Sequence, residues 1–409
     1  MRTISIAEID PDFTTAINEV MRQPHTKDSF YVNICENRED VFDYNFTVSG
    51  DPVSFQCDNH PGSQFQVKND NLFTAVLDGK SFSFKEASTK GIMGRGASNF
   101  LSVGVIDVDG VQYVTGDFFG NVEVCDASRQ SVRSFINVHA GPVMHTRFFP
   151  SGKVILTGSN DMRLKILSIE DGSNPRTFVG HPSRITGTAI IGRGRNILSS
   201  AADGTIRLWE CGSGSNIHTF VRRENSTDSV SAIALIPGSG NINPTSSRNM
   251  EYGTEGNIVL GGYYTGVVTA FDVFTKQEVM QFPNQFMASC SSLCVDSDDQ
   301  NYVYAGYGDG TVAMWDRRSP NKSLEEVTLG DGLVPSGLMH MNGKLVISGN
   351  TERNILVDVD RAKRKFDTQN PCFLSSSGQF LSLASYTDKK GTSVLFGVGF
   401  EETFHEYKF

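Results

Sequence analysis

The chain has 409 residues, of which 38% are hydrophobic and 20% are charged, and its formal net charge at pH 7 is −10. This acidic balance argues against nucleic acid and anionic membranes as partners, because both need a basic surface, and it favours a cationic protein partner. The hydrophobic content excludes a largely disordered chain. The 40 glycines, against 14 prolines, suit many tight turns between short strands.

The sequence leads us to expect neither a targeting segment nor a cysteine motif. Residues 1–20 carry acids without an apolar core, and no run of about 18 apolar residues occurs anywhere. The seven cysteines form no C-x-x-C pair, which argues against a zinc site and a disulfide framework. We therefore expect a cytoplasmic and nuclear protein with reduced thiols, no cofactor, no metal and no membrane contact.

The first 70 residues are expected to form a small N-terminal domain. They include strand-like segments such as SFYVNICENRED and VFDYNFTVS, and helical periodicity is confined to residues 14–22. Residues 72–87, LFTAVLDGKSFSFKEA, follow this domain and have the apolar and aromatic pattern of a strand.

A pattern of strand, tight turn and strand then recurs seven times. Its copies are marked by equivalent small residues at Gly116, Gly158, Ser200, Gly262, Gly306, Gly349 and Gly397. Successive spacings are 42, 42, 62, 44, 43 and 48 residues, and a period of about 40–45 residues is typical of four-stranded propeller blades.

This period predicts an all-β fold, a seven-bladed β-propeller over residues 71–409. The one long spacing is explained by a polar loop at residues 236–257, inserted in the fourth blade. The last copy ends at Phe409 without an outer strand. We expect residues 72–87 to supply that strand and close the ring, which would remove an exposed sheet edge.

The repeats resemble the WD-repeat family. In that family a Gly-His pair, a Ser or Thr, an Asp and a Trp form a hydrogen-bonded tetrad in each blade, and this sequence has one complete set: His181 after Gly180, Ser199, Asp203 and Trp209. The preceding blade offers His139, Thr157 and Asp161, with Leu167 at the Trp position. The resemblance implies that these residues are structural, because buried polar groups must satisfy one another.

A closer resemblance is to the proteasomal ATPase-associated factors, which are WD-repeat assembly chaperones of the proteasome regulatory particle. It rests on the segments FFPSG (148–152), IEDGSNPRTFVGH (169–181), RGRN (193–196) and DGTIRLWECGSGSNIHTF (203–220). It implies a non-enzymatic protein that binds the C-terminal domain of an AAA-ATPase subunit of the regulatory particle base. Apart from that partner, we expect a monomer.

The turns between the second and third strands are the predicted binding surface, because propeller rims recruit partners through exposed loops. Acidic and aromatic residues there would steer a basic partner and then anchor it. The predicted contact residues are Asp117, Phe118, Tyr263, Tyr264, Tyr307, Asp309, Asn350, Glu352, Phe400, Glu401 and Glu402.

Three other interpretations remain open at this point. Trp315-Asp316-Arg317-Arg318 matches the W-D-x-R pattern of substrate receptors for cullin-type ubiquitin ligases, although Arg318 could simply pair with an acid of its own blade. An enzyme would have to use the Ser199, His181 and Asp203 set or the segments GRGRN and CGSGSN, and neither segment has the strand-turn-helix setting of a phosphate loop. A purely structural scaffold is the third.

Overall fold

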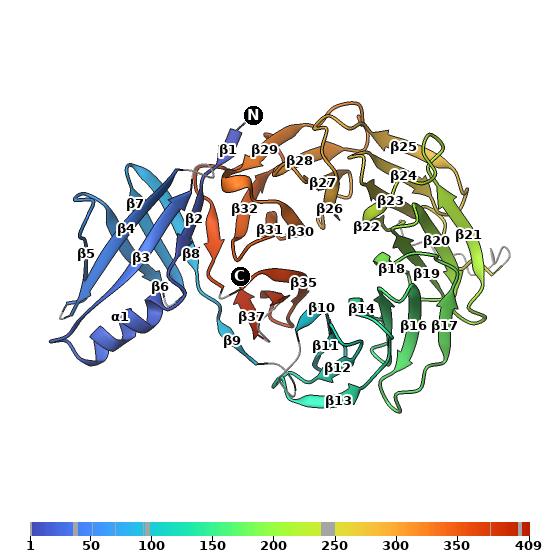
Figure 1. Ribbon diagram of the computed structural model, residues 1–409, viewed down its shortest axis with the longest axis horizontal. Helices are drawn as coiled ribbons and strands as arrows, with labels where there is room; N and C mark the ends of the chain where they lie inside the picture. Colours follow the sequence, from blue (N-terminus) through green and yellow to red (C-terminus); the bar gives the residue numbers. More distant parts are fainter. Residues whose placement is uncertain are drawn as a thin grey trace.

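The computed structural model describes residues 2–35, 40–50, 52–69, 71–92, 94, 99–238, 250–376, 378–399 and 403–409. In these residues, seven antiparallel blades are arranged as a ring, and a smaller N-terminal unit lies outside the ring (Figure 1). Blades 1 to 4 and blade 7 are four-stranded sheets, whereas the sheets of blades 5 and 6 continue into strands from the N-terminal part of the chain. The first strand of every blade lies nearest the centre of the ring (Figure 1). No helix in this part of the chain has the length and apolar character needed to cross a membrane.

The first four blades follow one another along the chain, each as an antiparallel meander. Blade 1 contains β10 (Phe100–Asp107), β11 (Val111–Asp117), β12 (Val122–Cys125) and β13 (Ser131–Phe135). Blade 2 contains β14 (Val143–Phe148), β15 (Val154–Ser159), β16 (Arg163–Ser168) and β17 (Arg176–Val179). Blade 3 contains β18 (Ile185–Ile191), β19 (Asn196–Ala201), β20 (Thr205–Glu210) and β21 (Asn216–Val221). Blade 4 contains β22 (Val230–Ile236), β23 (Ile258–Tyr263), β24 (Val268–Asp272) and β25 (Glu278–Phe282).

The last three blades each receive a strand from the N-terminal part of the chain. Blade 5 contains β26 (Cys290–Val295), β27 (Tyr302–Tyr307), β28 (Thr311–Asp316) and β29 (Glu325–Leu329), and is followed by the short helix η1 (Gly330–Gly332). Blade 6 contains β30 (Pro335–Met341), β31 (Lys344–Gly349), β32 (Asn354–Asp360), β33 (Lys365–Phe366) and β34 (Cys372–Leu374). Blade 7 contains β35 (Phe380–Thr387), β36 (Ser393–Gly399), β37 (Thr403–Lys408) and β9 (Thr89–Ile92).

The second strand of a blade is buried on both of its faces, because each blade is packed between two others. Every residue of β19 is buried. Between blades 2 and 3, Leu156, Ile197 and Trp209 belong to one buried apolar cluster. The core of the propeller is therefore a series of layers between adjacent blades, and it needs strands that are apolar on both sides.

The strand that closes the ring is β9, so the prediction that residues 72–87 close it is wrong. Thr89 pairs with Glu406 and Ile92 with Thr403 across the antiparallel ladder between β9 and β37. The closure is reinforced from blade 1, where Arg129 forms an ion pair with Glu406 at 2.5 Å. The closing strand has four residues and no apolar run, which explains why its sequence gives little signal.

Residues 72–87 instead contribute a hairpin to the N-terminal unit. Strands β7 (Leu72–Leu77) and β8 (Lys80–Lys85) are joined at Asp78 and Gly79, both of which have positive φ, as a tight hairpin turn requires. The unit therefore extends beyond the predicted boundary at residue 70. Its other elements are β2 (Ile6–Ile9), α1 (Phe13–Arg22), β3 (Lys27–Cys35), β4 (Val41–Ser49), β5 (Ser54–Cys57) and β6 (Gln64–Asn69).

An aromatic core holds the N-terminal unit together. Helix α1 buries Phe13, Ala16, Ile17 and Val20, which recur at helical spacing on one face. The ring of Phe13 meets that of Phe73 edge to face, with 4.7 Å between centroids. This packing joins the helix to the β7–β8 hairpin and explains why the hairpin stays with the helix instead of closing the ring.

Two parallel strand pairs fasten this unit to the propeller. Strand β1 (Arg2–Ile4) pairs with β29 of blade 5, and β8 pairs with β34 of blade 6. Figure 1 shows the unit beside these two blades, with the N-terminus next to β29. Both outer edges are therefore covered, which removes two places where another chain could add a strand.

The insertion at residues 236–257 is the connection between β22 and β23 of blade 4, and residues 239–249 within it lie outside the described residues. The part of the insertion that leads into β23 contacts blade 3. The side chain of Asn196 donates to the carbonyl oxygen of Met250 at 3.1 Å and accepts from the backbone N–H of Tyr252 at 2.6 Å. The Arg195 guanidinium lies 3.4 Å from the centroid of the Tyr252 ring.

Candidate functional site

One end of the ring carries the turns between second and third strands together with the loops that lead from one blade to the next. We call this end the turn face. In the described chain it consists of the turns 118–121, 160–162, 202–204, 264–267, 308–310 and 350–353 and the loops 136–142, 180–184, 222–229, 283–289 and 330–334. The remaining turns lie at the other end, which we call the opposite face.

Blade 3 joins its turn to its core through a continuous chain of hydrogen bonds. His181 Nδ1 lies 2.8 Å from Asp203 Oδ2, and His181 Nε2 lies 2.8 Å from Ser199 Oγ. The Trp209 indole N–H donates to the same Ser199 oxygen at 2.8 Å. The four tetrad residues named from the sequence are thus brought together in space.

This set of residues holds the turn and cannot act as a catalytic triad. The side chain of Ser199 is fully buried, and its oxygen is already bonded to both the imidazole and the indole, whereas a nucleophile must reach a substrate. Burial raises the pKa of Asp203, but the hydrogen bonds from His181 and Thr205 lower it more, so the carboxyl stays below its usual range.

Blade 2 has the shorter version of the same arrangement. His139 lies 2.9 Å from Asp161 and 2.8 Å from Thr157, and the buried Leu167 takes the place of the tryptophan. The leucine side chain has no hydrogen-bond donor. The chain of hydrogen bonds can therefore end at Thr157 without leaving a buried N–H group unpaired.

Three of the residues predicted to contact a partner are buried. Tyr263 and Tyr307 are fully buried, and Asp117 is 4% exposed. All three end a second strand, where both faces are covered by neighbouring blades. Asp117 accepts hydrogen bonds from the backbone N–H groups of Phe119 and Asn121 at 2.9 and 2.8 Å. These residues shape the turns and do not present a binding surface, which corrects the sequence prediction.

Five other predicted contact residues are exposed on the turn face: Phe118, Tyr264, Asp309, Asn350 and Glu352. The side chains of Phe118 and Tyr264 are 53% and 71% exposed. Asn350 also joins its turn to the loop 330–334, since its side-chain oxygen accepts from Val334 N–H at 3.0 Å. The remaining three predictions, Phe400, Glu401 and Glu402, lie outside the described residues.

The sequence prediction missed further exposed apolar side chains on or beside this face. They are Phe119, Ile136, Met162, Val179 and Met287. Phe119 is 62% exposed and meets Phe118 edge to face at 5.8 Å, while Met287 is 93% exposed. In blade 1, Phe119 occupies the position that Asp203 has in blade 3. The loss of the tetrad Asp at this position was the sequence feature that could have identified Phe119 as an exposed residue.

Charge on the turn face is divided, which corrects the prediction of an acidic surface. Blades 2 to 4 present the exposed arginines Arg163, Arg184 and Arg223, with one exposed acid, Glu224, beside Arg223. Asp309 and Glu352 lie on blades 5 and 6. The N-terminal unit borders the acidic side, because Glu8 forms an ion pair with Arg353 of the blade 6 turn at 3.0 Å.

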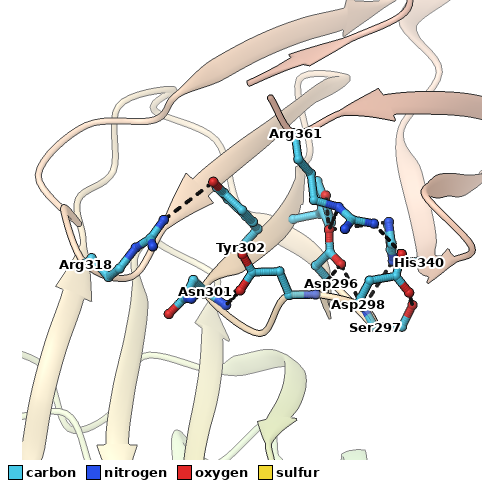
Figure 2. Close-up of polar contacts among 10 residues, drawn as sticks. Asp296, Ser297, Asp298, Asn301, Tyr302, Arg318, His340 and Arg361 are labelled. Atoms are coloured by element: carbon cyan, nitrogen blue, oxygen red, sulfur yellow. Dashed lines mark hydrogen bonds and ion pairs between the residues drawn. The ribbon is translucent and has the colours of Figure 1, made fainter. Parts of the chain in front are cut away.

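A cluster of possible metal ligands lies between blades 5 and 6, and an arginine fills it. Asp296, Asp298 and His340 each offer one possible ligand atom, and these three atoms lie within 4.8 Å of one another. Figure 2 shows Arg361 reaching this cluster: its Nε lies 3.0 Å from Asp296 Oδ2, and its Nη2 bonds to Asp298. The guanidinium supplies the positive charge that a metal would bring, so the cluster works as an ion-pair contact between blades.

Arg318, the last residue of the W-D-x-R match, pairs with an acid of its own turn. Its Nε and Nη2 donate to the Asp316 carboxylate at 2.8 and 2.7 Å. Figure 2 shows Arg318 extending toward the Tyr302 hydroxyl, 3.5 Å away. This pairing explains the residue without an adaptor, so the ubiquitin-ligase interpretation gains no support from the structure.

Comparison with known proteins agrees with the propeller. The family model described as WD domain, G-beta repeat matches residues 129–168, 172–210 and 279–316. The Schistosoma mansoni WD repeat-containing protein SL1-17 is 34% identical over 64 residues, which cover 16% of this chain and 21% of that protein. The Saccharomyces cerevisiae 26S proteasome regulatory subunit RPN14 is 35% identical over 97% of this chain and 96% of its own. The chain belongs to the family of WD-repeat proteins that includes this proteasome regulatory subunit.

Proposed function

We propose that the protein is an assembly chaperone for the base of the proteasome 19S regulatory particle, and that its turn face binds the C-terminal domain of an AAA-ATPase subunit. Near full-length similarity to the yeast proteasome regulatory subunit supports a proteasome-related role. The match of residues 148–220 to the proteasomal ATPase-associated factors supports the chaperone activity. Seven free cysteines suit the reducing cytoplasm and nucleus, where this role would be performed.

The observation that carries the proposal is the exposure of large apolar side chains at two places on the turn face, in the turn of blade 1 and in the loops of blades 4 and 5. Phe118, Phe119, Tyr264 and Met287 are each more than half exposed there. Large apolar side chains held in water on a rigid surface mark protein interfaces, and aromatic rings are the usual anchors. The tetrad of blade 3 and the shorter hydrogen-bonded set of blade 2 stiffen the same face, so little ordering would be needed on binding.

The mechanism we propose is occupancy. The aromatic side chains would cover an apolar area on the ATPase subunit, and the exposed charges around them would set the orientation of the complex. Covering that area blocks premature contacts during assembly. No chemical step is required, which agrees with the burial of the only Ser-His-Asp set that the sequence singled out.

The test is a titration of the full chain against the purified C-terminal domain of each base ATPase, followed by calorimetry at low and high salt. We expect one of these domains to bind. The double variant Phe118→Ser and Phe119→Ser should weaken that binding at least about tenfold, because it removes two adjacent aromatic anchors. Its urea midpoint should stay close to that of the wild type, since both rings are exposed.

Val108→Ser is the matched control, because Val108 is also about half exposed, at 47%, and lies in the β10–β11 turn on the opposite face. It should leave ATPase binding unchanged. The proposal fails if the wild type binds none of the ATPase domains at low salt. If the double variant and the wild type bound equally well, the turn face would not be the surface that binds the ATPase domain.

A further inference from the structure

A groove of about 340 Å³ opens on the opposite face, between blades 2 and 3. It runs from the turns between first and second strands toward the outer strands. The lining residues are Phe149, Ser151, Val154, Ile166, Pro175, Arg176, Arg193, Gly194 and Cys211. We call it the two-arginine groove. The GRGRN and ECGSGS segments, which the turn face does not use, form one of its walls.

The floor of the groove is apolar and is fixed by a glycine. Gly194 has φ of +86°, and a Cβ at this position would lie 2.3 Å from the Phe149 ring. The glycine therefore lets the turn lie directly against that ring. Cys211 completes the floor as a neutral thiol, because burial raises its pKa to about 12.

The rim of the groove carries positive charge from Arg176 and Arg193. Arg176 Nη1 donates to the Pro175 carbonyl oxygen at 2.7 Å and its Nε to that of Gly212. These carbonyls position the guanidinium without neutralising it. Arg193 is exposed and has no carboxylate partner in the described chain.

Two carboxylates near these arginines in the sequence, Asp171 and Glu210, accept hydrogen bonds from their own turns. Asp171 accepts from the backbone N–H and the hydroxyl of Ser173 at 3.1 and 2.8 Å. Glu210 accepts from the backbone N–H groups of Gly212 and Ser213 at 2.8 and 2.6 Å. Neither acid forms an ion pair with Arg176 or Arg193 among the described residues, so both guanidinium groups can bind a carboxylate of a ligand.

We propose that the two-arginine groove binds a short acidic peptide segment of a partner protein, with one bulky apolar side chain inserted between the two arginines. The volume is near the lower end of the roughly 300–1,000 Å³ of ligand pockets, which suits one or two side chains. The arginines recognise the flanking carboxylates, for which the guanidinium geometry is well matched. This site lies at the opposite end of the ring from the turn face and does not depend on the proposed chaperone function.

The probe for the test is a fluorescein-labelled pentapeptide with a central leucine and two glutamates on either side. Fluorescence anisotropy with the full chain should give saturable binding that weakens as salt is raised. Arg193→Glu and Arg176→Glu should each weaken binding at least about tenfold, since each places a carboxylate against the ligand. Arg163→Glu, an equal charge change on the turn face, is the matched control and should bind like the wild type.

Two comparison ligands separate the parts of the proposal. Replacing the central leucine by serine should weaken binding by several-fold, and replacing the glutamates by glutamines should abolish it. The proposal is overturned if the pentapeptide shows no saturable binding up to about 1 mM, or if Arg163→Glu weakens binding as much as the groove variants. It is also overturned if a single-stranded oligonucleotide of equal charge displaces the peptide at lower concentration, because the groove would then recognise phosphate.

Discussion

Blades 1 and 3 share a backbone plan but use the turn between their second and third strands in opposite ways. In blade 3 the turn residue Asp203 points back to His181, and the chain of hydrogen bonds ends on a buried tryptophan. In blade 1 the turn instead presents Phe118 and Phe119 to solvent. The comparison teaches that a repeat position released from the tetrad can carry an exposed apolar side chain, as Phe119 does.

The difference also extends into the core of each blade. Trp209 fills the space between blades 2 and 3 and packs against Phe178 with 5.6 Å between ring centroids. The equivalent residue of blade 1 is Cys125, which is fully buried but much smaller. Blade 1 therefore reaches its stability without the indole and without the polar chain attached to it.

The largest expected effect comes from breaking the blade 3 arrangement at its centre. Trp209→Ala should lower the free energy of unfolding by about 3–5 kcal/mol, because it leaves a cavity and removes the donor to Ser199. Cys125→Ala, the matched change in blade 1, should cost about 1 kcal/mol. Urea unfolding midpoints of the full chain measure both. If the two variants lost similar amounts of unfolding free energy, Trp209 would contribute no more to the stability of blade 3 than Cys125 contributes to that of blade 1.

The second largest effect is expected in the turn of blade 1, where a buried carboxylate accepts hydrogen bonds from the backbone of the turn. Asp117→Ala should cost about 2 kcal/mol, because a 4% exposed carboxylate that holds two backbone N–H groups is lost. Asp309→Ala is the comparison variant, since Asp309 lies within the corresponding turn of blade 5 and accepts from the Thr311 N–H at 2.9 Å but is exposed; it should cost less than about 1 kcal/mol. Urea midpoints again decide, and an equal loss at both positions would show that burial of Asp117 contributes nothing.

The ring itself could be predicted from the sequence because its signal is periodic. Each second-strand copy is apolar, and its spacing identifies a blade even where the tetrad is missing. The closing strand could not be predicted, because β9 has four residues and its partner β37 is more than 300 positions away. The β7–β8 hairpin carried a stronger strand pattern and was therefore mistaken for it.

The candidate binding face was only partly predictable, for a related reason. Alternation normally distinguishes the buried from the exposed side chains of a strand, but second strands in this fold are buried on both faces. Tyr263 and Tyr264 are adjacent in sequence, and one is fully buried while the other is 71% exposed. The change occurs where the strand ends and the turn begins, a boundary that residue identity alone does not fix.

The smallest expected effect is an acid-dependent loss in the blade 3 turn. The folded-state pKa of Asp203 is held below its usual value by His181 and Thr205, although burial opposes this. A carboxyl with a lowered pKa stabilises the fold fully above about pH 4, and this contribution is lost as the pH falls through the folded-state pKa. Asp203→Asn should therefore be less stable than the wild type at pH 7 by about 1 kcal/mol, and this difference should shrink as the pH falls below about 4.

Cys125→Ala in blade 1 serves as the control for this titration, because the change adds no group that ionises in that range. Its difference from the wild type should stay constant while that of Asp203→Asn shrinks. Urea midpoints at a series of pH values measure both differences. If the Asp203→Asn difference were constant down to pH 2, the carboxylate charge would not stabilise the turn, and the contrast with blade 1 would rest on the size of the buried side chain alone.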